Sequence, residues 1–278
     1  MQIEEIGGLV NEKIKRIDEC FHKAIDNFED KDIREFRSEI RKLKAFLHLL
    51  SMESEDGLSC SITRRMRITY GYLGIIHNFH LQLKEASEYE KKSSKHIPAF
   101  YMDMLEKEFD YWKKISKGYV DPDYDFLTDE YEILATLPDN LTNKSKINFI
   151  NYTLYEIGEM SARQDEEGLN NVRKFMEDIY YNLPLLNPFL TRQFTILFDE
   201  KEVNECLKLF SKFRDKCTAI VLLQTFSTDT LEKHEKQLLK QMEYDWLCEK
   251  KEIKEQLISK LDALHITDNH LKELSLQE

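Results

Sequence analysis

The stretch IREFRSEIRKLKAFL, residues 33–47, repeats its apolar side chains at helical spacing. The apolar positions are Ile33, Phe36, Ile40, Leu43 and Leu47. At about 100° per residue, these side chains fill an arc of about 80° on the surface of a helix. Asp30 and Asp32 precede the run, where a helix N-cap would lie. The stretch therefore predicts an amphipathic α-helix that buries one narrow face.

The same periodicity recurs along most of the chain. It predicts helices at residues 5–30, 33–50, 64–90, 100–114, 144–160, 169–183, 189–198, 202–225 and 228–265. Between residues 118 and 145, Gly118, Pro122 and Pro138 mark turns, and the acidic stretch 121–132 favours a solvated linker. We therefore expect an all-α protein with an N-terminal helical bundle (1–120), a connection (121–143) and a C-terminal helical bundle (144–278).

Length and composition support this division. The 278 residues suit two halves of about 140 residues each. A charged fraction of 33%, with only 8 Gly and 5 Pro, leaves little material for the many turns of an all-β fold. The net charge of −12 argues against a protein that coats nucleic acid, and specific nucleic-acid binding is not expected. An acidic total still leaves room for a local cationic channel.

The cysteines and the N-terminus bear on location. The five cysteines are scattered without a C-x-x-C pair, so they predict neither a disulfide framework nor a zinc site. The first residues lack the basic and apolar regions of a signal peptide. No apolar run approaches the ~20 residues that span a bilayer. We therefore expect a cytoplasmic protein without membrane association.

An internal repeat relates the two halves. Residues 33–43 align with residues 169–179 at an offset of 136, with four apolar positions in common. Residues 74–78 align with residues 211–215 at nearly the same offset. Two matches in the same order suggest a duplication, so we expect the two halves to superpose.

A cationic stripe follows the apolar face of the first repeat and consists of Arg34, Arg37, Arg41 and Lys44. Glu35 and Glu39 lie on the far side of the helix, so Arg34 and Arg41 are expected to lack acidic partners three or four residues away. Three interpretations fit the stripe. It could be a solvated flank that shields the core, a set of bridges to acids on neighbouring helices, or a groove that grips phosphate oxygens bidentately.

These residues resemble the motifs of the CHAD (conserved histidine α-helical domain) family. REFRSEIRKLKAF, residues 34–46, follows the basic helical motif of that family from its second element onward. LGIIHN, residues 73–78, looks like its Leu-Gly-x-x-Arg-Asp signature. In the second half, LNNVRK, residues 169–174, and the pair Arg214-Asp215 are similar to the repeated motif.

The resemblance implies two pseudo-symmetric antiparallel four-helix bundles around a central basic cavity. It also implies binding of inorganic polyphosphate or a related phosphate-rich polyanion, without catalysis. The implied binding residues are Arg34, Arg37, Arg41, Lys44, Arg173, Lys174 and Arg214. Both hallmark histidines of the family are absent, with Arg34 and Asn170 in their places, and Glu177 stands where the first half has Arg41. The second half is therefore expected to carry less positive charge.

Other functions are weighed against this one. The sequence has no phosphate-binding glycine loop and no nucleophile elbow. His77 and His80 have a spacing that could hold a metal, but no Glu-x-x-His pattern accompanies them, so packed histidines are favoured and neither metal nor cofactor is expected. A helical scaffold for protein–protein interaction, without polyanion binding, is the alternative. A phosphoanhydride hydrolase comes third, because no paired carboxylate metal site can be placed.

Overall fold

The computed structural model describes residues 1–53, 60–121, 123–186, 200–226 and 231–263. The long helices of the first half are α1 (Ile3–Asn27), α2 (Asp30–Leu50), α3 (Arg64–Ser93) and α4 (Ala99–Tyr119). Those of the second half are α6 (Asn143–Arg163), α7 (Glu166–Leu186), α9 (Glu200–Thr225) and α10 (Lys233–Ala263). The shorter elements are the 3-10 turns η1 (Ser51–Glu53) and η2 (Phe126–Asp129) and the helix α5 (Glu130–Leu134).

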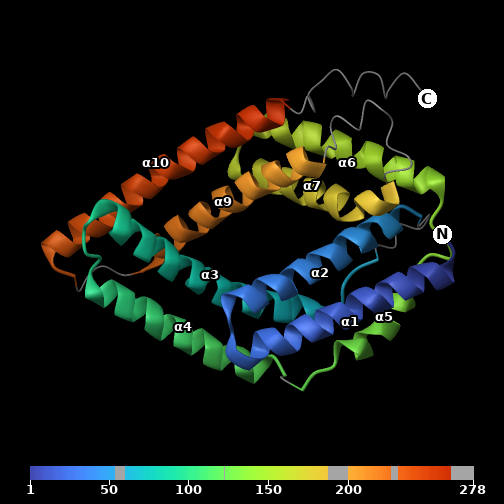
Figure 1. Cartoon of the computed structure of the whole chain (residues 1–278), viewed down its shortest axis with the longest axis horizontal. Helices are drawn as coiled ribbons and strands as arrows, with labels where there is room; N and C mark the ends of the chain where they lie inside the picture. Colours follow the sequence, from blue (N-terminus) through green and yellow to red (C-terminus); the bar gives the residue numbers. More distant parts are fainter. Residues whose placement is uncertain (54–59, 122, 187–199, 227–230, 264–278) are drawn as a thin grey trace.

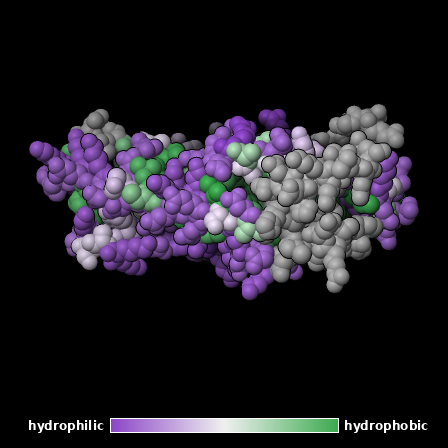
Figure 2. Space-filling view, turned by 90° about the horizontal axis from the view of Figure 1, so that it is seen from above, coloured by the Kyte–Doolittle hydropathy of each residue, from purple (hydrophilic) through white to green (hydrophobic). Residues whose placement is uncertain are grey.

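The all-α prediction is confirmed for these residues. Within the described ranges, extended pairing is limited to one isolated bridge between Gln2 and Asn140. The helix predicted at residues 189–198 lies outside the described residues. On the face shown in Figure 2, hydrophilic side chains predominate and hydrophobic ones gather in small areas between them.

α1 and α2 form a hairpin because each carries a continuous apolar seam. The fully buried side chains of the α1 seam include Ile6, Val10, Ile14, Ile17 and Phe21. The chain reverses at Phe28, whose φ of 56° is left-handed and whose N–H donates to the Ala24 carbonyl at 3.2 Å. A left-handed non-glycine residue costs about 1–2 kcal/mol. Burial of the Phe28 ring, which is 2% exposed, contributes about 2 kcal/mol and offsets that cost.

The helices pack in two groups, and each group has members from both halves of the chain (Figure 1). In one group α2 lies against α7, with α1 packed on α2 and α6 packed on α7. In the other group α3 lies against α9, with α4 packed on α3 and α10 packed on α9. Where the groups meet, α2 contacts α3 and α7 contacts α9. The buried apolar residues of these helices form one hydrophobic core.

The helix bounds follow the internal repeat. α2 and α7 both have 21 residues, and their first residues, Asp30 and Glu166, are 136 positions apart. The left-handed residues that follow α1 and α6, Phe28 and Gln164, are also 136 positions apart. These spacings support the duplication. The superposition of the halves stays a prediction, and so does the division at residues 120 and 144.

The connection between the halves packs against α1. Both η2 and α5 contact this helix. Phe126 is fully buried, and its ring meets the Phe21 ring edge-on with the centroids 5.0 Å apart. Asp129 is also buried and accepts a hydrogen bond from Thr63 Oγ1 at 2.8 Å. The solvated-linker interpretation of residues 121–132 is therefore wrong for this part of the stretch.

Candidate anion-binding groove

Three adjoining pockets lie along the seam where α2, α3, α7 and α9 meet. The α2–α3 pocket, of about 150 Å³, is closed on one side by α9, and the α7–α9 pocket measures about 260 Å³. The α2–α7 pocket measures about 370 Å³. Arg214 lines the first two pockets, Arg173 lines the second and third, and Arg41 lines the first and third. Because each pair of pockets shares a wall residue, we describe the three as one groove.

All seven cations that the sequence predicted as binding residues line this groove. They are Arg34, Arg37, Arg41, Lys44, Arg173, Lys174 and Arg214. An eighth, Lys84, follows His80 by four residues on the same face of α3, a spacing from which the sequence could have predicted it. The carboxylates of the groove are Asp30, Glu166, Glu177, Asp178 and Asp215. Eight cations against five carboxylates leave three positive charges in excess, whereas the whole chain carries −12.

Arg37 is the innermost cation of the stripe. Its Nη1 donates to the Tyr70 carbonyl at 2.7 Å, and its guanidinium lies 4.0 Å from the centre of the Tyr70 ring. A Cβ at Gly74 would collide with Nη1, so the glycine makes room for this side chain. Arg37 forms no ion pair with any residue that the structure describes. Burial lowers the pKa of Arg37, and the nearby charges of Arg214, Arg41 and Arg173 lower it further.

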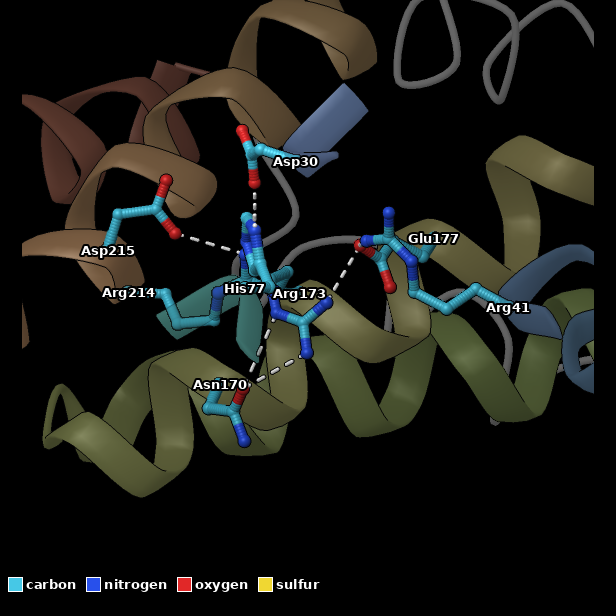
Figure 3. Close-up of polar contacts among 8 residues, drawn as sticks. All are labelled: Asp30, Arg41, His77, Asn170, Arg173, Glu177, Arg214 and Asp215. Carbon is cyan, nitrogen blue, oxygen red and sulfur yellow. Dashed lines mark hydrogen bonds and ion pairs between the residues drawn. The ribbon is translucent and has the colours of Figure 1, made fainter. Parts of the chain in front are cut away.

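Glu177 stands between two further arginines (Figure 3). Its Oε1 lies 2.7 Å from Nη1 of Arg41 and 2.7 Å from Nη1 of Arg173. Burial acts to lower the pKa of Arg41, but the charge and hydrogen bond of Glu177, together with Tyr181 and Tyr70, outweigh burial and raise it. The shared carboxylate does not satisfy Arg41 fully, because Arg41 Nε is buried without a hydrogen-bond partner among the described residues. Part of the donor capacity of this guanidinium therefore stays unused.

The outer cations lie at the rim of the groove. Lys44 and Lys174 are exposed, and Lys174 Nζ donates to Asn171 Oδ1 at 3.0 Å. Arg214 pairs with the adjacent Asp215 at 3.0 Å. The prediction that Arg34 has no acidic partner on its own helix is wrong, because Arg34 pairs with Asp30, four residues earlier, at 2.9 Å. The sequence placed Asp30 at the helix N-cap, whereas it lies in the first turn of α2 and can reach Arg34.

The histidines of the groove are held by hydrogen bonds. His77 Nδ1 lies 2.7 Å from Asp30 Oδ1, and His80 Nε2 donates to the Phe28 carbonyl at 2.8 Å. Burial acts to raise the pKa of Asp30, but its contacts with His77 and Arg34 outweigh burial and hold the pKa below its ordinary value. His48, which the sequence did not single out, lines the α2–α7 pocket beside Asp178.

The structure of the chain resembles a solved CHAD domain. The crystal structure of the CHAD domain from the plant Ricinus communis matches with a TM-score of 0.72, over 95% of this chain and 92% of that chain. The fold is CHAD-like. The two sequences are 14% identical, so the likeness concerns the fold alone. No family model and no curated protein sequence matches the chain.

The two positions that match the hallmark histidines of CHAD domains both line the groove. Arg34 belongs to the α2–α3 pocket, and Asn170 belongs to the α7–α9 pocket. Asn170 Oδ1 accepts from Arg173 Nη2 at 3.2 Å and so orients this guanidinium (Figure 3). At these two positions the groove thus has a permanently charged guanidinium in one half and a neutral amide in the other.

No group of three or more His, Cys, Asp and Glu residues in the part of the chain that the structure describes could hold a metal ion. None of the helices that the structure describes is long and apolar enough to cross a membrane. All five cysteines are free thiols. The predictions of no metal, no cofactor and a cytoplasmic location stay predictions.

Proposed function

We propose that the groove binds inorganic polyphosphate or a related phosphate-rich polyanion, and that the protein holds this ligand without transforming it. The observation that carries the proposal is the cluster of Arg37, Arg41, Arg173 and Arg214. Three of these cations lower the pKa of Arg37, which itself has no carboxylate partner among the described residues. A cluster of this kind is poorly compensated by the protein and is suited to an anion from solution.

The energetics favour a phosphate ligand. A desolvated cation without a partner costs several kcal/mol, and a bound anion would remove much of that cost. Guanidiniums match phosphate oxygens with two parallel N–H···O bonds, and each such contact contributes about 1.5–3 kcal/mol. Because the three pockets share wall residues, successive phosphates of one polymer could contact successive cations. The CHAD-like fold supports the same ligand through the resemblance of its motifs.

The rival function is a helical scaffold for other proteins that does not bind polyanions. It requires the groove cations to serve folding or solubility only. The two functions differ most at Arg37, because this residue is enclosed by other cations and its charge is not needed to balance a described acid.

Changing Arg37 to Glu tests the proposal. The change removes one phosphate contact and adds repulsion, so we expect affinity for long-chain polyphosphate to fall ~100-fold or more. Isothermal titration calorimetry gives the affinity, and thermal unfolding shows whether the variant folds. Arg37→Gln removes the charge without reversing it and should cost roughly 10-fold or more.

Lys240→Glu is the matched control, since Lys240 is exposed on α10 and lines none of the three pockets. Its effect on affinity should stay within about twofold at ~150 mM salt. Lys250 is unsuitable as a control, because its Nζ pairs with Glu166 of the α7–α9 pocket at 2.7 Å. Equal affinities for the two Glu variants would favour the scaffold.

A further inference from the structure

The α7–α9 pocket differs from the rest of the groove, because its walls are mostly apolar. Phe210, Phe213 and Cys217 of α9 line one side, and both phenylalanines are buried. Burial raises the pKa of the Cys217 thiol to about 12, so this side chain is neutral at physiological pH. An inorganic polyphosphate chain consists of charged groups throughout and gains nothing from apolar walls.

Polar groups stand on the α7 side of the same pocket. Glu166, Asn170 and Arg173 are spaced at i, i+4 and i+7, so they lie on one face of the helix. Asn170 Nδ2 has no hydrogen-bond partner among the described residues and points away from Arg173 in Figure 3. Glu166 pairs with Lys250, but a carboxylate has about four acceptor positions and keeps capacity for another donor.

We propose that the ligand of this groove carries a planar nitrogenous ring joined to its phosphates, as a nucleoside triphosphate does. The inference rests on the proposed function, because Arg173 and Arg214 must hold the phosphates at the boundary between this pocket and its neighbours. The ring then enters the α7–α9 pocket beside Phe210 and Phe213. The free amide of Asn170 donates to a ring nitrogen or carbonyl, and Glu166 accepts from an amino group.

The size and polarity of the pocket favour a nucleobase over other organic groups. A volume of about 260 Å³ suits one ring system, near the lower end of ordinary ligand pockets. Apolar walls with a few hydrogen-bonding groups at the edge are the usual surroundings of an unpaired base. An acyl chain would fill the apolar walls but offer no hydrogen bond to Asn170 Nδ2 or to the remaining acceptor positions of Glu166.

The test compares ATP and GTP with tripolyphosphate, which carries a similar charge but no base. Each ligand is titrated into the full chain by calorimetry without divalent cations. Because contact of one base with aromatic side chains strengthens binding substantially, at least one nucleotide should bind about 10-fold or more tightly than tripolyphosphate. Cys217→Phe should fill the pocket and lower the affinity for that nucleotide to the level of tripolyphosphate. The affinity for tripolyphosphate should not change. Cys217→Leu serves the same purpose if the larger side chain prevents folding.

The outcomes separate this inference from the proposed function. Equal binding of tripolyphosphate and both nucleotides would overturn the inference and leave the polyanion site standing. A nucleotide advantage that survives both Cys217 variants would also overturn it, because the base would then lie elsewhere. Absence of binding for all three ligands and for long-chain polyphosphate would instead end the proposed function.

Discussion

The α2–α3 pocket and the α7–α9 pocket occupy matching places in the internal repeat, yet they differ in polarity. At offsets of 136 and 137, the matching pairs are Asp30 with Glu166, Arg34 with Asn170, Arg37 with Arg173, His77 with Arg214 and His80 with Cys217. At the offset of 137, Leu73 and Ile76 correspond to Phe210 and Phe213. Among these matched pairs, both pockets have an acid at the first position and an arginine at the third, whereas the other positions differ.

The difference shows which positions the groove depends on. Arg37 and Arg173 lie on the two helices that pack together at the seam, and both take part in the guanidinium cluster. Among the changed positions, those of Arg34, Asn170, His77, His80 and Cys217 each face one pocket only, whereas Arg214 lines two pockets and joins the cluster. The α2–α3 pocket is the more polar of the two and suits phosphates, whereas the α7–α9 pocket is mostly apolar and suits an organic group.

Glu177→Gln has the largest expected effect, because Glu177 is the carboxylate shared by the two halves of the cluster. Its loss leaves Arg41 and Arg173 unpaired in a partly desolvated place, so the free energy of unfolding should fall by about 3 kcal/mol. Affinity for polyphosphate should rise about 10-fold, since the ligand no longer competes with an internal carboxylate. Thermal unfolding with and without polyphosphate measures both effects.

Glu35→Gln is the control for that change. Glu35 pairs with Arg16 at an exposed place outside the groove, and such a pair contributes less than about 1 kcal/mol. An unchanged polyphosphate affinity in Glu177→Gln would show that this carboxylate does not compete with the ligand.

Exchanging Arg34 and Asn170, the residues at the two hallmark positions, tests the difference in charge between the two pockets. Arg34→Asn should weaken tripolyphosphate binding about 10-fold, and Asn170→Arg should strengthen it by a similar factor. The double variant should bind roughly as the wild type does if the two positions act independently. Calorimetric titration of the three variants decides the matter. Two single changes of the same sign would contradict the proposal that positive charge at either position favours phosphate binding.

Gly74→Ala has the smallest expected effect. The new methyl group would meet the far end of the flexible Arg37 side chain, so the fold should hold while the guanidinium shifts. We expect polyphosphate affinity to fall about 5-fold and stability to change by no more than about 1 kcal/mol. Gly71→Ala on the same helix is matched to it, because a Cβ at Gly71 would meet nothing within 4 Å. Equal affinities of the two variants would mean that Arg37 does not need its present position.

The helices could be predicted from the sequence because their apolar residues recur at regular spacing. The same spacing placed Arg34, Arg37, Arg41 and Lys44 beside the buried face, where all four reach the groove. Local spacing does not determine which helices pack together. The pairing of Arg41 with Glu177, 136 residues away, depends on the register of α2 against α7.

Short segments were harder to predict than long helices. Phe126 is one aromatic residue in an acidic stretch, and its burial depends on the presence of α1 beside it. The apolar α7–α9 pocket also gave no signal, because Phe210 and Phe213 repeat at the spacing of ordinary core residues.

Titration of long-chain polyphosphate into the wild-type protein at two salt concentrations shows whether the groove binds polyanions. Binding through several phosphate contacts releases counterions, so affinity depends steeply on salt. Polyanion binding in the groove predicts clear binding at ~50 mM salt that weakens by ~100-fold or more at ~200 mM salt. No binding at ~50 mM salt would contradict it, and so would an affinity that does not change between the two concentrations.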